Sequence, residues 1–89
     1  MRDFSIEDGL KKILAKLLKR DKSTYEALMS KIKEIVNCGD VNHYKNLRNP
    51  LQHLKRTHIG SFVLTFKYVE AEDKLYFYDF DHHDNIYNK

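Results

Sequence analysis

The segment of residues 54–68 constrains the fold most, because it has the pattern of two β-strands joined by a tight turn. Both halves are rich in β-branched and aromatic residues, and Gly60-Ser61 between them can adopt the positive φ of a short hairpin turn. Successive side chains of a strand point to opposite faces. One face of the predicted hairpin is therefore an apolar core face that includes Phe62, Leu64, Phe66 and Tyr68, whereas the other carries Arg56 and His58.

Two amphipathic helices are predicted before this hairpin. Apolar residues recur at helical spacing over residues 10–18 and again over residues 25–36,. Ser23 and Glu26 have the spacing of a capping box, in which two side chains satisfy free amide groups at a helix start. The short polar stretch 20–23 allows only a tight reversal, so the two helices are expected to form a helical hairpin.

The order of predicted elements defines the fold class. Residues 1–6 are predicted to form a strand, residues 40–53 a surface connection with the only proline, and residues 75–80 a last strand,. We therefore expect an α+β fold in which an N-terminal strand and a helical hairpin pack on a C-terminal antiparallel β-meander. At 89 residues, the chain is expected to be a single domain, 1–89,.

Composition excludes some classes of protein. Hydrophobic residues make up 42% and charged residues 33% of the chain, a balance typical of soluble globular domains,. The sequence contains neither an apolar run of the roughly 18 residues that a membrane span needs nor a signal-peptide core, so we expect a cytoplasmic protein with no membrane contact. The formal net charge of +3 mildly favours anionic partners such as nucleic acids,.

A metal site is not expected from the histidine pair near the C-terminus. His82 and His83 are flanked by Asp81 and Asp84, which are possible metal ligands. Adjacent side chains on a strand point to opposite faces, however, and no second pair of ligands has the spacing of a helical or finger site. We therefore expect neither a metal nor another cofactor.

Several short motifs, in their order along the chain, resemble a known family. They are Lys45-Asn-Leu47 before an Asn49-Pro-Leu51 turn, then Arg56-Thr-His-Ile-Gly60, then Phe62-Val-Leu-Thr-Phe66, then a polar turn, a last strand and a terminal His/Tyr cluster. This arrangement resembles the RelE/ParE superfamily of toxins from toxin–antitoxin systems, and within it the RelE and YafQ-like ribonucleases. The resemblance covers nearly the whole chain and depends on order and spacing rather than on any single motif.

The resemblance implies a metal-independent endoribonuclease, an mRNA interferase that inhibits translation by cutting mRNA in the ribosomal A site beside the 16S rRNA. In such a reaction a ribose 2′-OH attacks the adjacent phosphate, leaving a 2′,3′-cyclic phosphate and a 5′-OH. This chemistry needs a base, an acid and donors that stabilise the charge on the phosphate. The resemblance also implies a RelB-like antitoxin that neutralises the toxin, a heterotetramer with that antitoxin, and a monomer when free.

Carried onto this sequence, the resemblance gives two sets of site residues. The implied catalytic residues are Arg56, His58, His83 and Tyr87, and the implied RNA-binding residues are Lys45, Arg48, Lys55 and Lys67. Many members of the family have an arginine directly after the aromatic residue of the second hairpin strand. Val63 occupies that position here, which removes one cation expected to bind phosphate.

Two alternatives from other functional classes stay open at the level of sequence. One is a ParE-like toxin that inhibits DNA gyrase, and the other is a catalytically inactive module that only binds an antitoxin. Arg56 and His58 favour the ribonuclease, whereas Val63 leaves both alternatives open. Alanine substitutions at His58, His83 or Tyr87 separate the hypotheses, because only a ribonuclease has RNA cleavage to lose.

Overall fold

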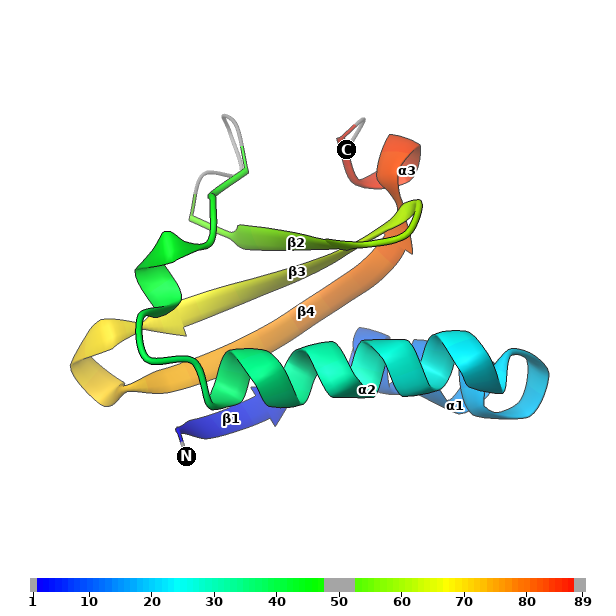
Figure 1. Ribbon diagram of the computed structural model, residues 1–89, viewed down its shortest axis with the longest axis horizontal. Coiled ribbons are helices and arrows are strands. Elements are labelled where there is room, and N and C mark those ends of the chain that lie inside the picture. Colours follow the sequence, from blue (N-terminus) through cyan, green and yellow to red (C-terminus); the bar gives the residue numbers. More distant parts are fainter. Residues whose placement is uncertain (1, 48–52, 88–89) are drawn as a thin grey trace.

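The computed structural model describes residues 2–47 and 53–87, and it confirms the predicted α+β fold. A strand and two helices are followed by three strands and a short C-terminal helix (Figure 1). No helix in these two stretches is long and apolar enough to cross a membrane. The elements are β1 (Asp3–Ile6), α1 (Asp8–Arg20), α2 (Lys22–Val36), η1 (Val41–His43), β2 (Lys55–Ile59), β3 (Phe62–Val69), η2 (Glu70–Glu72), β4 (Lys74–His82) and α3 (His83–Tyr87).

The four strands form one sheet in the order β1-β4-β3-β2. β2, β3 and β4 make the predicted antiparallel meander, and β1 lies parallel to β4 at the edge. The tight turn is also confirmed, since Ile59 pairs with Phe62 and Gly60 has a φ of 61°. Glycine suits this position because the left-handed region is costly for residues with a Cβ.

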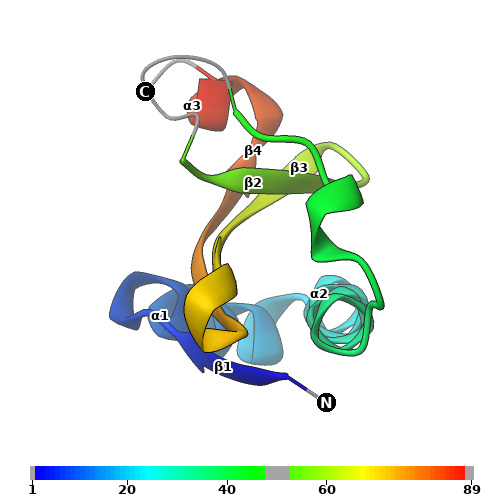
Figure 2. The same cartoon turned by 90° about the vertical axis from the view of Figure 1, so that its left-hand side faces the viewer.

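The main core lies between the sheet and the helical hairpin. Figure 2 shows α1 and α2 together on one side of the strands, with α3 on the opposite side. The apolar face of the β2–β3 hairpin packs against the helices, as the alternation predicted. The fully or nearly buried members of the main core are Leu10, Leu28, Ile32, Ile35, Val36, Val41, Leu64, Phe66, Leu75, Phe77 and Phe80.

A β-bulge in β4 interrupts simple alternation. Thr65 pairs with Asp79 and Phe66 pairs with Phe77, so Tyr78 is an extra residue on β4. The bulge lets Phe77 and Phe80 both enter the core although they are three residues apart,. It also keeps Asp79 on the face opposite to the helices.

The start of α2 differs from the prediction. The capping box of Ser23 and Glu26 is wrong, because the N-cap residue is Asp21, whose carboxylate accepts a hydrogen bond from the Thr24 backbone N–H at 3.2 Å. The same carboxylate accepts the Thr24 hydroxyl at 2.6 Å. The backbone N–H of Asp21 also donates to the Leu17 carbonyl, so one residue ends α1 and begins α2. Because Asp21 caps both helices, the connection between them is shorter than it would be if α2 began after a cap at Ser23.

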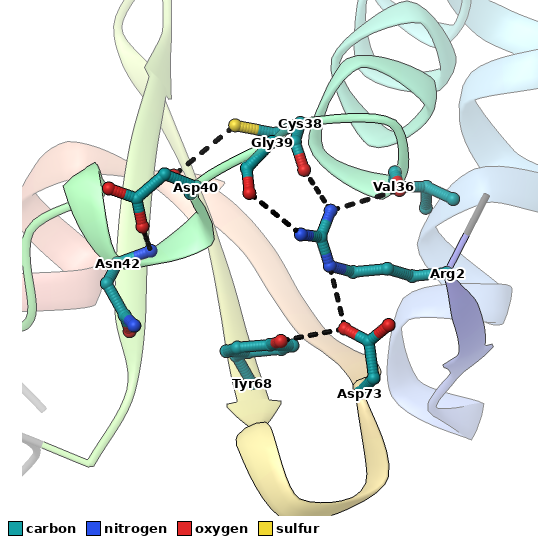
Figure 3. Close-up of polar contacts among 8 residues, drawn as sticks. All are labelled: Arg2, Val36, Cys38, Gly39, Asp40, Asn42, Tyr68 and Asp73. Carbon is teal, nitrogen blue, oxygen red and sulfur yellow. Dashed lines mark hydrogen bonds and ion pairs between the residues drawn. The ribbon is translucent and has the colours of Figure 1, made fainter.

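Arg2 connects the N-terminus to two other parts of the fold (Figure 3). Its guanidinium donates to backbone carbonyls at and beyond the end of α2, those of Val36, Cys38 and Gly39. Its Nε donates to Asp73 in the β3–β4 turn at 2.9 Å. A cation at a helix C-terminus is favourable because the unpaired carbonyls carry partial negative charge. The side chain is only 16% exposed, so this contact also covers that edge of the core.

The environment of the Asp73 carboxylate is expected to make the free energy of unfolding depend on pH. Hydrogen bonds from the Tyr68 hydroxyl, at 2.7 Å, and from Arg2 lower the pKa of Asp73 below its usual value. Its stabilisation is therefore present above an unfolded pKa of about 3.9 and is lost as the pH falls through the lower folded pKa. We expect Asp73→Asn to be less stable than wild type at pH 7, with the difference shrinking below about pH 4.

Urea unfolding at several pH values measures this difference. Asparagine tolerates the φ of 48° at this position, so the variant changes the charge without a new backbone penalty,. Tyr68→Phe removes only one donor and is expected to give a smaller loss. Equal acid dependence in wild type and Asp73→Asn would contradict the assignment.

Candidate active site

The face of the sheet opposite to α1 and α2 carries the candidate site. Pairing between strands places His58 beside Val63 and Arg56 beside Thr65. Side chains of paired residues lie on the same face of a sheet. The side chains of Arg56 and His58 therefore lie on the face away from the main core, as the alternation predicted.

The structure brings His58 and His83 together, although 25 positions separate them in the sequence. Their ring centroids are 5.9 Å apart and the rings are inclined by 31°. His83 begins α3, and its backbone N–H donates to the Ser61 carbonyl of the hairpin turn at 2.9 Å. Both imidazoles are exposed, so they are accessible to a ligand on this face.

Asp84 lies next to both C-terminal histidines. Its carboxylate is 3.3 Å from Nδ1 of His83 and 3.7 Å from Nδ1 of His82. His82 packs edge-to-face on Phe62, which belongs to the helix-covered face. Only His83 of the pair lies with His58, because His82 ends β4 whereas His83 already belongs to α3. The prediction that both histidines continue the strand was therefore wrong for His83.

Arg56 and Lys45 lie side by side on the candidate site's face. Residues 45–47 run antiparallel to the start of β2, with Asn46 paired to Lys55. The Arg56 backbone N–H donates to the Lys45 carbonyl at 2.9 Å. Lys45 is exposed and Arg56 is half-buried, so two neighbouring cations lie on the side of His58 away from the hairpin turn.

The remaining residues implied by the resemblance have different positions. Lys55 lies on the other side of β2, where its ammonium donates to the Tyr44 carbonyl at 3.3 Å and to Asn46 Oδ1 at 3.1 Å. Lys67 is half-buried on the candidate site's face, two residues beyond Thr65. Arg48 lies outside the described residues. The backbone of Tyr87 ends α3, but its side chain is outside the described part of the chain.

Val63, which stands where many family members have an arginine, is fully buried and is not part of the exposed surface. Together with Leu47 and Ile86 it forms a small apolar cluster, which we call the α3 socket, and Leu54 packs at its edge. The exposed fractions of the three members are 0%, 5% and 3%. Sequence reasoning missed this second core, because Ile86 in the terminal stretch gave only a single apolar residue without periodicity.

Acidic side chains on β4 were also missed as part of this face. Asp79 pairs with Thr65 and Asp81 pairs with Val63, which puts both on the same side as Arg56. Their Oδ1 atoms accept the backbone N–H groups of the residues that follow them, at 2.9 and 2.7 Å. The face is thus basic along β2 and acidic along β4. Within the described ranges, no three His, Cys, Asp or Glu side chains are placed to hold a metal ion.

This arrangement suits acid–base chemistry on an anion. Two imidazoles at 5.9 Å between centroids can both approach one phosphodiester group, and imidazole can give or take a proton near neutral pH,. The neighbouring guanidinium of Arg56 supplies a planar donor of the kind that binds phosphate oxygens. The geometry therefore defines a small basic α+β protein with a two-histidine site on its open sheet face.

Comparison with known sequences assigns the family. The chain is 50% identical over 90 residues to a Methanocaldococcus jannaschii protein named "Putative toxin RelE4", covering 100% of this chain and 94% of that protein. It is 40% identical over 85 residues to a Methanosarcina mazei protein named only as uncharacterized, covering 94% and 96% of the two chains. No protein-family model matches the sequence. The chain belongs to the RelE family of toxins.

Solved structures share the fold at low sequence identity. The intact Escherichia coli RelBE toxin–antitoxin complex contains a chain with a TM-score of 0.72 at 12% identity, covering 92% of this chain and 96% of that one. The isolated Escherichia coli RelE toxin gives a TM-score of 0.65 at 10% identity, with coverage of 92% and 84%. The Helicobacter pylori protein HP0894 gives 0.66 at 18%, with coverage of 94% and 97%. These likenesses support the fold.

Proposed function

We propose that this RelE-family toxin is a metal-independent endoribonuclease that cuts mRNA in the ribosomal A site. In the proposed reaction the ribose 2′-OH attacks the adjacent phosphorus while its proton passes to one imidazole. The bond to the 5′-oxygen breaks as that oxygen takes a proton from the other imidazole. The products are a 2′,3′-cyclic phosphate and a 5′-OH.

The contact between His58 and His83 is the main observation that supports this proposal. Transesterification of RNA needs one neutral base and one protonated acid on the two sides of a phosphate, and two imidazoles at this spacing can fill both roles,. Arg56 and Lys45 are proposed to bind the non-bridging oxygens and stabilise the charge that grows on them. Val63 supplies no cation at the position where many family members have an arginine, so few groups stabilise the phosphate. Positioning of the mRNA by the ribosome is therefore expected to contribute strongly to the rate.

Primer extension on translating ribosomes tests the activity. With wild-type toxin we expect cuts in phase with the codon in the A site. Arg56→Ala is expected to reduce the cleavage rate by about 10²- to 10³-fold, the loss typical of removing one donor to a developing oxyanion. The matched control is Arg20→Ala, because Arg20 is exposed at the end of α1, away from the candidate site.

The absence of cuts from folded wild-type protein would contradict the ribonuclease proposal. A DNA supercoiling assay with gyrase would then separate a gyrase inhibitor from an inactive antitoxin-binding module. Cuts that persist unchanged in Arg56→Ala would remove Arg56 from the site but keep the activity.

A RelB-like antitoxin is the proposed regulatory partner. One fold relative was solved in a toxin–antitoxin complex, and the net charge of +3 favours an acidic, partly disordered chain that folds on binding,. We propose a heterotetramer with this antitoxin and a monomer when free. Light scattering of the toxin with and without its antitoxin measures both states.

A further inference from the structure

The α3 socket lies directly beside the histidine pair. His58 and Val63 are cross-strand partners on β2 and β3, so their side chains are neighbours on one face,. Above them lies α3, in which His83 and Ile86 are three residues apart. Residues at this spacing lie on the same side of a helix. One side of α3 therefore contacts both partners: His83 lies beside the exposed ring of His58, and Ile86 packs on the buried Val63.

Packing must fix the position of α3, because the helix has only five residues. A helix of this length has no stability of its own in water. The contacts that hold it include the 97% burial of Ile86 in the α3 socket, the His83 N–H that donates to the Ser61 carbonyl at 2.9 Å, and the Asn85 amide that donates to Asp81 Oδ1 at 3.1 Å. Of these, only the Ile86 contact buries apolar surface. The ion pair of His83 with Asp84, by contrast, is exposed and contributes little,.

We infer that the α3 socket of Leu47, Val63 and Ile86 is a positioning device that holds His83 against His58. This inference rests on the proposed function of the histidine pair. The buried valine has a definite role in it, because a smaller or charged side chain at position 63 would leave Ile86 without its partner. The socket touches neither RNA nor the reacting atoms and acts only through the imidazole of His83.

Ile86→Ala tests the inference. Loss of the apolar contact is expected to lower kcat about 10- to 100-fold with little change in KM, because a shift of about 1 Å in a reacting group has effects of this size. Exchange of the His83 amide hydrogen is expected to become faster, since α3 detaches from Ser61. Ile86→Leu keeps an apolar side chain and is expected to restore both properties.

A matched control separates positioning from general stability. Ile13→Ala makes the same substitution on α1, where Ile13 packs partly buried against the main core. It is expected to lower the melting temperature while leaving kcat and His83 amide exchange unchanged. Wild-type values of kcat and of amide exchange in Ile86→Ala would overturn the inference.

Val63→Arg gives a second, opposite test. If Val63 only marks a missing cation, adding an arginine should speed cleavage. If Val63 holds α3, the buried arginine displaces Ile86, and both kcat and the protection of the His83 amide should fall. Faster cleavage with an intact His83 amide would overturn the inference. If wild type cuts no RNA, the ribonuclease proposal fails, whereas amide exchange still decides whether the socket holds α3.

Discussion

Replacing His58 with alanine is expected to reduce the rate of mRNA cleavage by about 10²- to 10⁴-fold, the usual contribution of one general acid or base. His83→Ala is expected to have an effect of the same size. Both side chains are exposed, so neither substitution opens a cavity, and the folded state should persist. Rates are best measured in single-turnover reactions on programmed ribosomes, where product release does not contribute.

The two histidines are expected to act as a unit. A double variant should then be about as slow as the slower single variant, because removing one partner already stops paired proton transfer. His43→Ala is the matched control, since this exposed histidine lies at η1, where its Nδ1 contacts the Asp40 carbonyl.

A wild-type rate in either single variant would remove that histidine from the mechanism. Multiplied losses in the double variant would instead show that the two rings act independently. In that case His58 and His83 would contribute to binding or to charge stabilisation rather than to coupled proton transfer.

Truncating Phe77 is expected to lower the free energy of unfolding by about 3–5 kcal/mol, the range found for phenylalanine to alanine in protein cores. Phe77 is 0% exposed, and its ring centroid lies 5.8 Å from that of Phe66. Small domains have total stabilities of roughly 5–15 kcal/mol, so Phe77→Ala is expected to remove a large share of the stability and to lower the melting temperature markedly.

Urea or guanidinium unfolding followed by circular dichroism measures this loss. Phe4→Ala is the matched control, because Phe4 contacts the Phe77 ring at 6.1 Å but is 39% exposed. It should cost much less, since less apolar surface leaves water at that position. A loss below about 1 kcal/mol for Phe77→Ala would contradict its place at the centre of the core.

Local patterns were sufficient to predict much of the fold. The turn at Gly60 and the two faces of the hairpin follow from residue type and a period of two, and the helical hairpin follows from a period near 3.6. The same alternation placed Arg56 and His58 together on the face away from the core. These features depend on neighbours in sequence, which is why single-sequence reasoning reaches them.

Features set by tertiary contacts could not be predicted in the same way. The bulge at Tyr78 has no local signal, and the α3 socket joins Leu47, Val63 and Ile86 from three distant segments. The sequence implied Lys55 as an RNA-binding cation, but only the pairing of residues 45–47 with β2 shows that its ammonium contacts Tyr44 and Asn46. The approach of His83 to His58 likewise depends on where α3 packs.

The most direct test of the central proposal uses an mRNA with a single 2′-deoxynucleotide at the scissile position of the A-site codon. The proposed reaction begins with attack by that 2′-OH, so we expect wild-type toxin to cut the all-ribose mRNA and leave a 2′,3′-cyclic phosphate. The substituted mRNA should stay intact at that position while other codons remain cleavable. Cleavage of the 2′-deoxy position, or products that carry a 5′-phosphate, would contradict the mechanism and the role given to His58 and His83.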